Sequence, residues 1–381
     1  MATEYDLILV YTSFRRHNDY INIISCLARS YKVGIWLCDG WDRSGKIETE
    51  YLAHCEALGA RKVKNTAHCR LLILPRIGGG VAHDVFEILP NLVTAEKVCL
   101  LIGGVFNGFP FLDQTIKTFG RVSVLAARRD LLGLAEPDLI KKINEENLEV
   151  IEIGYPYRNH PIFPNFETDY LLAFPSHTTI TDDFEHFRLI EKMAWILLKL
   201  PRQKRVSIKP HNVRDDGNRL SKTVLLPFWL SRMLAYGVGI PLVYSIRFLN
   251  LKIKSRDSIQ IVPRRIIRIM TTLMLFFIFH RGDNLLKNYP GYGIEHFIHG
   301  IKEALISGIS TSMVYARLEG KDLIFVGEKP HAKTGAQALI YQYFIDPDTR
   351  VDMGSYGESQ PKYSANDCWG DVVEYLDYIL K

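Results

Sequence analysis

The chain has 381 residues, 47% of them apolar and 23% charged, with a formal net charge of +5. This length and composition suffice for two domains of ordinary size, each with its own hydrophobic core. The six cysteines are scattered without a Cys-x-x-Cys pattern, so neither a disulfide framework nor a zinc site is indicated. The first residues lack the basic and apolar regions of a signal peptide, so a cytoplasmic protein is expected.

The first half of the chain alternates short apolar runs with helical patterns such as residues 20–30. Strands that are buried on both faces and joined through helices form a parallel, doubly wound sheet. We therefore predict an α/β domain over residues 1–157, followed by a linker in the proline-rich stretch that ends near Pro164. The predicted strands lie at 7–11, 33–38, 71–74, 98–102, 122–125 and 148–151.

A second domain is expected over residues 168–381. It opens with a strand that begins at Tyr170, followed by a long amphipathic helix at about 183–200. Residues 205–208 then form a short apolar strand, with Lys209 and His211 at its carboxyl end, where open α/β sheets bind ligands. A cation and an imidazole at this place favour an anionic ligand, although the same pattern also occurs at ordinary strand ends.

A second polar motif follows later in the chain. Ser310, Thr311 and Ser312 lead into a helical pattern at 313–318, and the NH and hydroxyl groups of a helix N-terminus suit a phosphate. Alone, this motif is also typical of a plain N-cap. The order of the two motifs, with a further strand predicted at 320–326, favours one shared phosphate site.

With these two motifs the chain resembles the two-domain (GT-B) glycosyltransferases of capsule and cell-wall assembly. These include cytidine-sugar-dependent sialyl- and Kdo-transferases and the CDP-glycerol glycerophosphotransferases of teichoic acid synthesis. In those enzymes a Lys-x-His-Pro motif and a later Ser/Thr-Ser loop hold the phosphate of the donor. The resemblance is strongest over residues 168–212 and 289–346, and Asn212 stands where the family has proline. It implies two Rossmann-like domains and donor-binding roles for Lys209, His211, Ser310, Thr311 and Ser312.

Glu295 is a further candidate for donor binding. The Tyr-Pro-Gly sequence at 289–291 predicts a tight turn, and Glu295 is expected to begin a helix running toward Ala304. An acid in the first turn of a helix is also favoured by the helix dipole alone. The resemblance implies the functional alternative, because a carboxylate near this point hydrogen-bonds the nucleoside in the similar transferases.

Direct transfer requires a base that takes the proton of the attacking hydroxyl group. Asp39 follows the predicted strand at 33–38 and partly resembles the acidic-Gly motif of bacterial sialyl- and polysialyltransferases. His83 and Asp84 follow the strand at 71–74 and three glycines, whose backbone allows a ligand to approach closely. We keep Asp39, Asp84 and His83 as catalytic candidates. A metal-independent mechanism is expected, with neither a metal nor another cofactor.

Residues 199–287 combine a strong positive charge with the most apolar segments of the chain. They contain 18 Lys or Arg residues and four acids, whereas the whole chain carries only +5. The apolar run at 266–279 is about 14 residues long, shorter than the roughly 20 that span a bilayer. Cations beside apolar helices suit an anionic membrane surface, so we predict a membrane-binding insertion at about 213–287, held by Phe276 and Phe277. A core helix and a nucleic-acid site are the other readings, and embedded aromatic residues disfavour the latter.

The sequence thus predicts a glycosyltransferase attached to the inner face of the cell membrane. Its expected partners are a nucleotide-sugar donor, preferably a CMP-sugar, a lipid-linked or polysaccharide acceptor and an anionic membrane surface, but no nucleic acid. A UDP-sugar or CDP-glycerol donor, a UDP-sugar 2-epimerase of similar fold and a noncatalytic membrane-bound scaffold stay open as alternatives.

Overall fold

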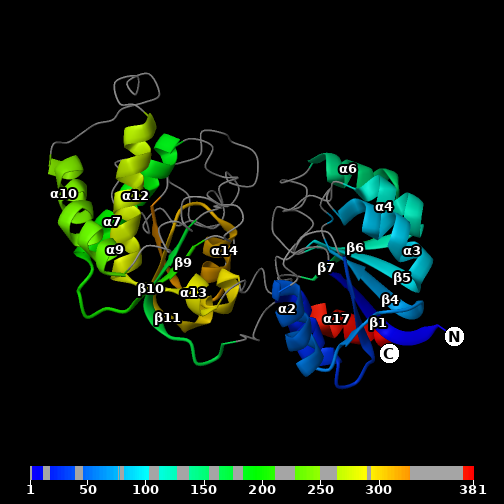
Figure 1. Ribbon diagram of the computed structural model, residues 1–381. Helices are drawn as coiled ribbons and strands as arrows, with labels where there is room; N and C mark the ends of the chain where they lie inside the picture. The colour runs from blue at the N-terminus through cyan, green and yellow to red at the C-terminus, as the bar shows by residue number, and fades with distance from the viewer. Residues whose placement is uncertain are drawn as a thin grey trace. The chain divides into compact units, whose positions relative to one another are not determined.

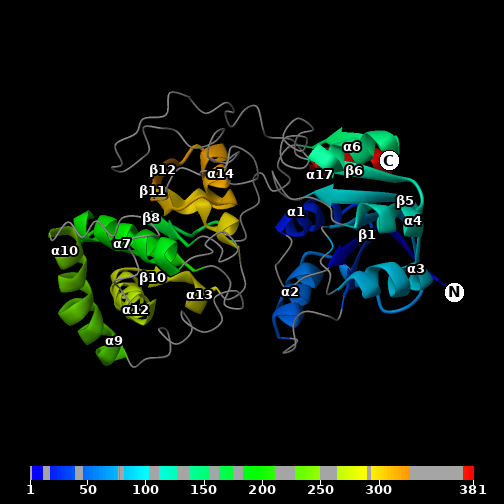
Figure 2. The same ribbon diagram turned by 90° about the horizontal axis from the view of Figure 1, so that it is seen from above.

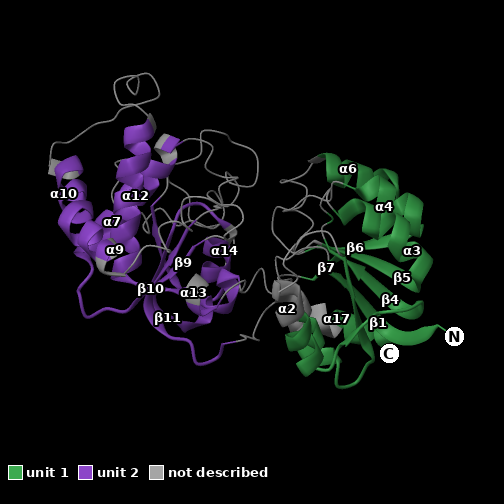
Figure 3. Ribbon diagram, in the orientation of Figure 1, with its two compact units in different colours: residues 1–162, 330–339, 363–381 green, residues 163–329, 340–362 purple. Residues whose placement is uncertain are grey.

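The structure, a computed structural model, divides into two compact units (Figures 1 and 3). Unit 1 comprises Met1–Ile162, Pro330–Leu339 and Tyr363–Lys381, and unit 2 comprises Phe163–Lys329 and Ile340–Lys362. Within them the structure describes residues 2–11, 18–38, 46–75, 77, 81–102, 111–126, 137–153, 163–174, 183–210, 228–248, 264–289, 293–326 and 372–381.

Unit 1 is built on a seven-stranded sheet in which every neighbouring pair is parallel. The strand order is β3-β2-β1-β4-β5-β6-β7, the order of a doubly wound Rossmann-like domain, and the direction of winding reverses between β1 and β4. The strands are β1 (Thr3–Tyr11), β2 (Val33–Leu37), β3 (Arg61–Lys62), β4 (Ala67–Leu74), β5 (Val93–Ile102), β6 (Val122–Ala126) and β7 (Val150–Glu152).

Both faces of this sheet are buried, as its continuous apolar runs predict. Alternate strand residues enter two separate hydrophobic clusters, one represented by Ile8 and Leu72 and the other by Leu9 and Ile73. The parallel α/β fold predicted for this half is therefore confirmed. The helices are α1 (Asn18–Leu27), α2 (Lys46–Ala57), the π-helix η2 (Asp84–Ile88), α3 (Leu89–Leu92), α4 (Leu112–Phe119) and α6 (Pro137–Glu145).

The last helix, α17 (Val372–Leu380), packs on unit 1. Leu376 and Leu380 are buried in the cluster that also contains Ile24 of α1. The Tyr31 hydroxyl group donates a hydrogen bond to Asp377 Oδ1 over 2.7 Å. The sequence-based boundary of 168–381 had assigned this helix to the second domain, whereas its apolar face is buried against the first.

Unit 2 contains a five-stranded parallel sheet ordered β10-β9-β8-β11-β12. Counted from its own first strand this is the order 3-2-1-4-5, so unit 2 repeats the winding of unit 1, with its reversal between β8 and β11. Two Rossmann-like domains were predicted, and both sheets have this character. The strands are β8 (Thr168–Ala173), β9 (Val206–Lys209), β10 (Asp283–Asn284), β11 (Ile301–Ser307) and β12 (Asp322–Phe325).

Helices cover unit 2 in layers (Figures 1 and 2). The helices α7 (Asp183–Lys199) and α12 (Arg264–Arg281) form one core with alternate residues of β8, β9 and β11, while α14 (Thr311–Leu318) packs near β11 and β12. A continuous helical stretch made of α9 (Phe228–Leu234), the π-helix η4 (Ala235–Gly239) and α10 (Ile240–Phe248) packs on α12. Among the described helices, none has the length and apolar character that crossing a bilayer requires.

The expectation that Phe276 and Phe277 face a lipid surface is wrong. Both side chains are buried in the core of unit 2, with Phe277 only 2% exposed. The cause is the close packing of α12 against α7, together with β10, which follows α12 and joins the edge of the sheet. Residues 264–284 therefore belong to the body of unit 2 and not to a separate insertion.

The helix predicted from Glu295 toward Ala304 is also wrong. The chain forms two short 3-10 turns, η6 (Ile294–His296) and η7 (Ile298–Gly300), and then enters β11. At Gly300 an added Cβ would lie 2.0 Å from the carbonyl oxygen of Phe166, so the backbone passes too close to its neighbour for a side chain. Short α13 (Leu285–Asn288) lies before these turns.

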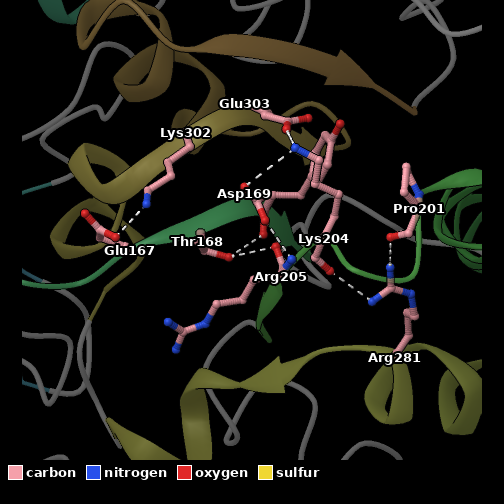
Figure 4. Close-up of polar contacts among 10 residues, drawn as sticks. Glu167, Thr168, Asp169, Pro201, Lys204, Arg205, Arg281, Lys302 and Glu303 are labelled. Atoms are coloured by element: carbon pink, nitrogen blue, oxygen red, sulfur yellow. Dashed lines mark hydrogen bonds and ion pairs between the residues drawn. The ribbon is translucent and has the colours of Figure 1, made fainter.

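The amino-terminal edge of the unit 2 sheet is held by ion pairs (Figure 4). Lys204 lies between Glu303, with which it pairs closely, and Asp169, at 4.0 Å. Lys302 contacts Glu167 at 2.6 Å, and the Arg205 side chain contacts Asp283 at 3.3 Å. These contacts join the starts of β8, β9, β10 and β11, so this edge is occupied by internal pairing.

Candidate functional site

The opposite, carboxyl-terminal edge of the unit 2 sheet brings the two sequence motifs together. The register pairs Ala173 of β8 with Lys209 on one side and with Ser307 of β11 on the other. Neighbouring strands lie about 4.8 Å apart, so the Lys209 and Ser307 backbones are separated by about 10 Å. The alternate residues Ile208 and Ile306 enter the core formed with α7 and α12, so Lys209 and Ser307 point to the other face.

Three serine hydroxyl groups are linked in the loop from β11 to α14. Ser307, which is fully buried, lies 3.2 Å from Ser310 through their Oγ atoms, and Ser310 Oγ contacts Ser312 Oγ. Ser310 is the N-cap residue of α14, with extended backbone angles of −160° and 161°. Hydroxyl groups and first-turn NH groups thus converge where the partial positive charge of a helix N-terminus favours an anion.

Lys209 and Glu295 interact near this loop. Lys209 is only 5% exposed, and its Nζ atom donates to the carbonyl oxygen of Pro210 over 3.3 Å. Burial raises the pKa of the Glu295 carboxyl group, while its own backbone NH and the charge of Lys209 lower it. The turn η6 that carries Glu295 packs on α14, so Glu295 lies near the serine motif.

The missing side chain at Gly293 leaves space for the carboxyl group of Glu295. An added Cβ at Gly293 would lie 2.1 Å from Glu295 Oε1. The carboxyl group therefore occupies the space that a side chain at 293 would fill. The sequence contains this glycine within a turn motif, but its relation to Glu295 requires the 3-10 geometry that sequence patterns did not predict.

Three of the predicted site residues have no described side chain. His211 and Asp39 lie outside the described residues, and Thr311 begins α14 without a described side chain. The donor-binding role of His211 and the catalytic role of Asp39 therefore stay predictions. Lys209, Ser310, Ser312 and Glu295 are the members of the predicted donor set whose surroundings the structure describes.

The other two catalytic candidates lie on unit 1, after β4. His83 and Asp84 stand at the start of the π-helix η2, and β4 borders the winding reversal of this sheet, where ligands bind in doubly wound folds. His83 Nδ1 lies 3.0 Å from Glu87 Oε2, and both side chains are exposed. Sequence reasoning missed Glu87, although its spacing of four residues from His83 on a helix could have indicated the pair.

A comparison with family models finds no match for this chain, and neither does a comparison with curated protein sequences. Several solved structures are similar at low level, among them the following three. A glycosyltransferase from Rickettsia africae has a TM-score of 0.38 and 12% identity, covering 98% of this chain and 88% of its own.

The wall teichoic acid polymerase TagF with CDPG has a TM-score of 0.36 and 10% identity, and the match covers 84% of this chain and 69% of TagF. HepE of Anabaena in complex with UDP has a TM-score of 0.36 and 10% identity, and the match covers 98% of this chain and 89% of HepE. Scores below 0.5 establish neither a shared fold nor a shared activity. The function of this chain must therefore be argued from its own site.

Proposed function

We propose that this protein is a glycosyltransferase that moves a sugar from a nucleotide-activated donor, a CMP-sugar in the first place, to a lipid-linked or polysaccharide acceptor. The observation that supports it is the convergence of Lys209, the Ser307–Ser310–Ser312 hydroxyl groups and the N-terminus of α14 at one edge of a Rossmann-like sheet. These groups would neutralise the charge on the departing phosphate, as preorganised donors do in phosphate-releasing transition states.

Glu295 is a further contact of the proposed donor site. A carboxylate accepts hydrogen bonds from the hydroxyl and amino groups of a nucleoside, and the charge of Lys209 acts on the Glu295 carboxyl group, which supports a shared donor site. The proposed donor set is therefore Lys209, His211, Glu295, Ser310, Thr311 and Ser312. We further propose that the enzyme works at the inner face of the cell membrane, where a lipid-linked acceptor would be available.

Nucleotide binding tests this proposal directly. CMP, CDP and UDP should be compared for the rise they cause in the melting temperature, because a ligand at about 100 times its Kd stabilises by about 2.7 kcal/mol. Ser310→Ala should abolish the shift, whereas Ser245→Ala, at an exposed serine of α10, should keep it. A rise in melting temperature with UDP or CDP alone would indicate a donor other than a CMP-sugar. No rise with any nucleotide would favour a noncatalytic scaffold.

The acceptor base is tested by turnover. Asp39→Asn, Asp84→Asn and His83→Gln should all retain nucleotide binding, because none of them belongs to the donor set. One of the three should lose about 100-fold or more in rate, the usual size of a general-base contribution. Full activity in all three variants would contradict the assignment of the base to these residues.

A further inference from the structure

Exposed apolar side chains are concentrated on one part of unit 2. Of the eight large apolar or aromatic side chains that are exposed in the described residues, six lie on α9, η4, α10 and α12. Ile266 and Ile269 stand one helical turn apart at the start of α12, with 46% and 59% exposure. The other four are Met233, Tyr236, Val238 and Tyr244. We call these six residues the apolar face.

The inward side of the α9–α10 stretch is closely packed, and its outward side also carries apolar side chains. Ala235, Val243 and Ile246 point inward and are buried, and Gly239 lets the helix approach α12 so closely that an added Cβ would lie 2.8 Å from the carbonyl oxygen of Leu273. A helix on the surface of a protein normally turns charged and polar groups to water. This one exposes Met233 and Tyr236 beside Arg232, so its outer side is adapted to a partly apolar environment.

The helices that carry the apolar face contain charged residues of one sign only. The helices at 228–248 and 264–281 contain six arginines and no acidic residue. Arg265 is exposed beside Ile266, and Arg232 is exposed beside Met233. Arg268 pairs with Asp183 of α7 at 2.8 Å, so its charge is balanced within the unit. Exposed arginines next to exposed isoleucine, methionine and tyrosine form a surface complementary to anionic lipid headgroups over acyl chains.

We propose that the apolar face docks on an anionic phospholipid bilayer, with α9–α10 and the first turns of α12 lying in the plane of the interface. The proposal rests on the membrane-attached transferase proposed above, and it assigns attachment to residues other than Phe276 and Phe277. A second copy of the chain fits less well. A twofold interface places the same patch against itself, which would bring arginine toward arginine without a carboxylate from these helices.

Vesicle flotation tests this assignment. The full chain is mixed with phosphatidylcholine vesicles that either contain or lack phosphatidylglycerol, at low and at high salt. We expect binding to the anionic vesicles, weakened but not abolished by salt, because apolar burial persists when charge is screened. The double variant Ile266→Gln/Ile269→Gln should lose about tenfold or more in vesicle partitioning, as should Met233→Gln/Val238→Gln. Arg265→Glu should reduce binding to the anionic vesicles specifically.

A matched control uses Ile88 and Tyr378, the two large apolar or aromatic side chains exposed in the described part of unit 1. Ile88→Gln/Tyr378→Gln removes side chains that are 40% and 78% exposed but lie outside the apolar face, so vesicle binding should be unchanged. Equal partitioning of all variants would overturn the proposal. So would a wild-type dimer that ignores vesicles and becomes monomeric on Ile266→Gln/Ile269→Gln, since the face would then bind a second copy.

Nucleotide binding separates this proposal from the transferase. Every variant of the apolar face should keep the nucleotide-induced rise in melting temperature, because none of its residues belongs to the donor set. Vesicle binding without any nucleotide response would support the docking face and contradict the transferase. Nucleotide binding by a wild-type protein that does not float with anionic vesicles would support the transferase and contradict the docking face.

Discussion

At the scale of single residues, Lys209 is the cation on which the proposed donor site depends. Removing an ammonium group from water is expensive unless nearby groups compensate, and here Glu295 and the Pro210 carbonyl group do so. Lys209→Met should therefore weaken nucleotide binding about tenfold or more, because a hydrogen bond to a charged group contributes about 1.5–3 kcal/mol.

Calorimetric titration with the nucleotide that gives the largest thermal shift measures this loss. Lys302→Met is the matched control, since Lys302 belongs to the ion pairs at the opposite edge of the same sheet. Unchanged nucleotide affinity in Lys209→Met, or an equal loss of affinity in Lys302→Met, would contradict the binding of the nucleotide phosphate by Lys209.

Glu295 should make the stability of the protein depend on pH. Its folded-state pKa is raised by burial, so the folded protein holds this proton more tightly than the unfolded chain. The free energy of unfolding should therefore fall as the pH rises above the ordinary pKa of glutamate and through the raised one. Glu295→Gln should remove this component, so that denaturant unfolding shows the variant gaining stability over the wild type with increasing pH. A difference that is constant from acid to neutral pH would contradict the raised pKa.

At the scale of elements, α12 contains core and surface positions a few turns apart. Phe277 is 2% exposed and packs within the core of unit 2, so Phe277→Ala should lower the free energy of unfolding by about 3–5 kcal/mol. Ile269→Ala, on the exposed side of the same helix, should change it by no more than about 0.5 kcal/mol. Urea unfolding followed by circular dichroism measures both changes, and similar effects would contradict the orientation of α12.

The elements also show what sequence patterns can and cannot predict. The strand that ends at Lys209 was predictable because Val206 and Ile208 form a short apolar run before a polar motif. β11 was missed, since its start carries Lys302 and Glu303, whose charges are satisfied by pairing with other elements. Phe276 and Phe277 lie in the largely apolar run at 266–279, and only the packing of α12 against α7 distinguishes a core helix from a membrane helix.

At the scale of the whole molecule, the last helix links the end of the chain to its beginning. Leu376 is fully buried against unit 1, and Leu376→Ala should destabilise that unit by about 2–5 kcal/mol. Hydrogen exchange should then quicken in β1 and α1 and stay unchanged in the unit 2 sheet. Tyr378→Ala, on the exposed side of α17, is the control and should leave both units as they are. Faster exchange in both units would indicate that they unfold together.

This contact could not have been read from the sequence. Residues 372–380 form an amphipathic helix, but nothing in a local pattern tells which of two α/β sheets its apolar side covers. The hydrogen bond between Tyr31 and Asp377 joins positions separated by 346 residues. A contact over such a separation produces no periodic pattern in the local sequence. The Lys209 motif was predictable for the opposite reason, because it follows directly from the end of one short apolar strand.

The return of α17 to unit 1 also decides how the molecule bears a mechanical load. The first strand and the last helix belong to the same unit. The segments of unit 2 therefore lie between segments of unit 1 in the sequence, and unit 2 does not simply follow unit 1. A pulling force applied at residues 3 and 380 enters and leaves through unit 1. Unit 2 stays shielded from tension until β1 and α17 have separated. Under an optical trap the extension should therefore show unit 1 yielding first, with the unit that carries the donor motifs opening only afterwards.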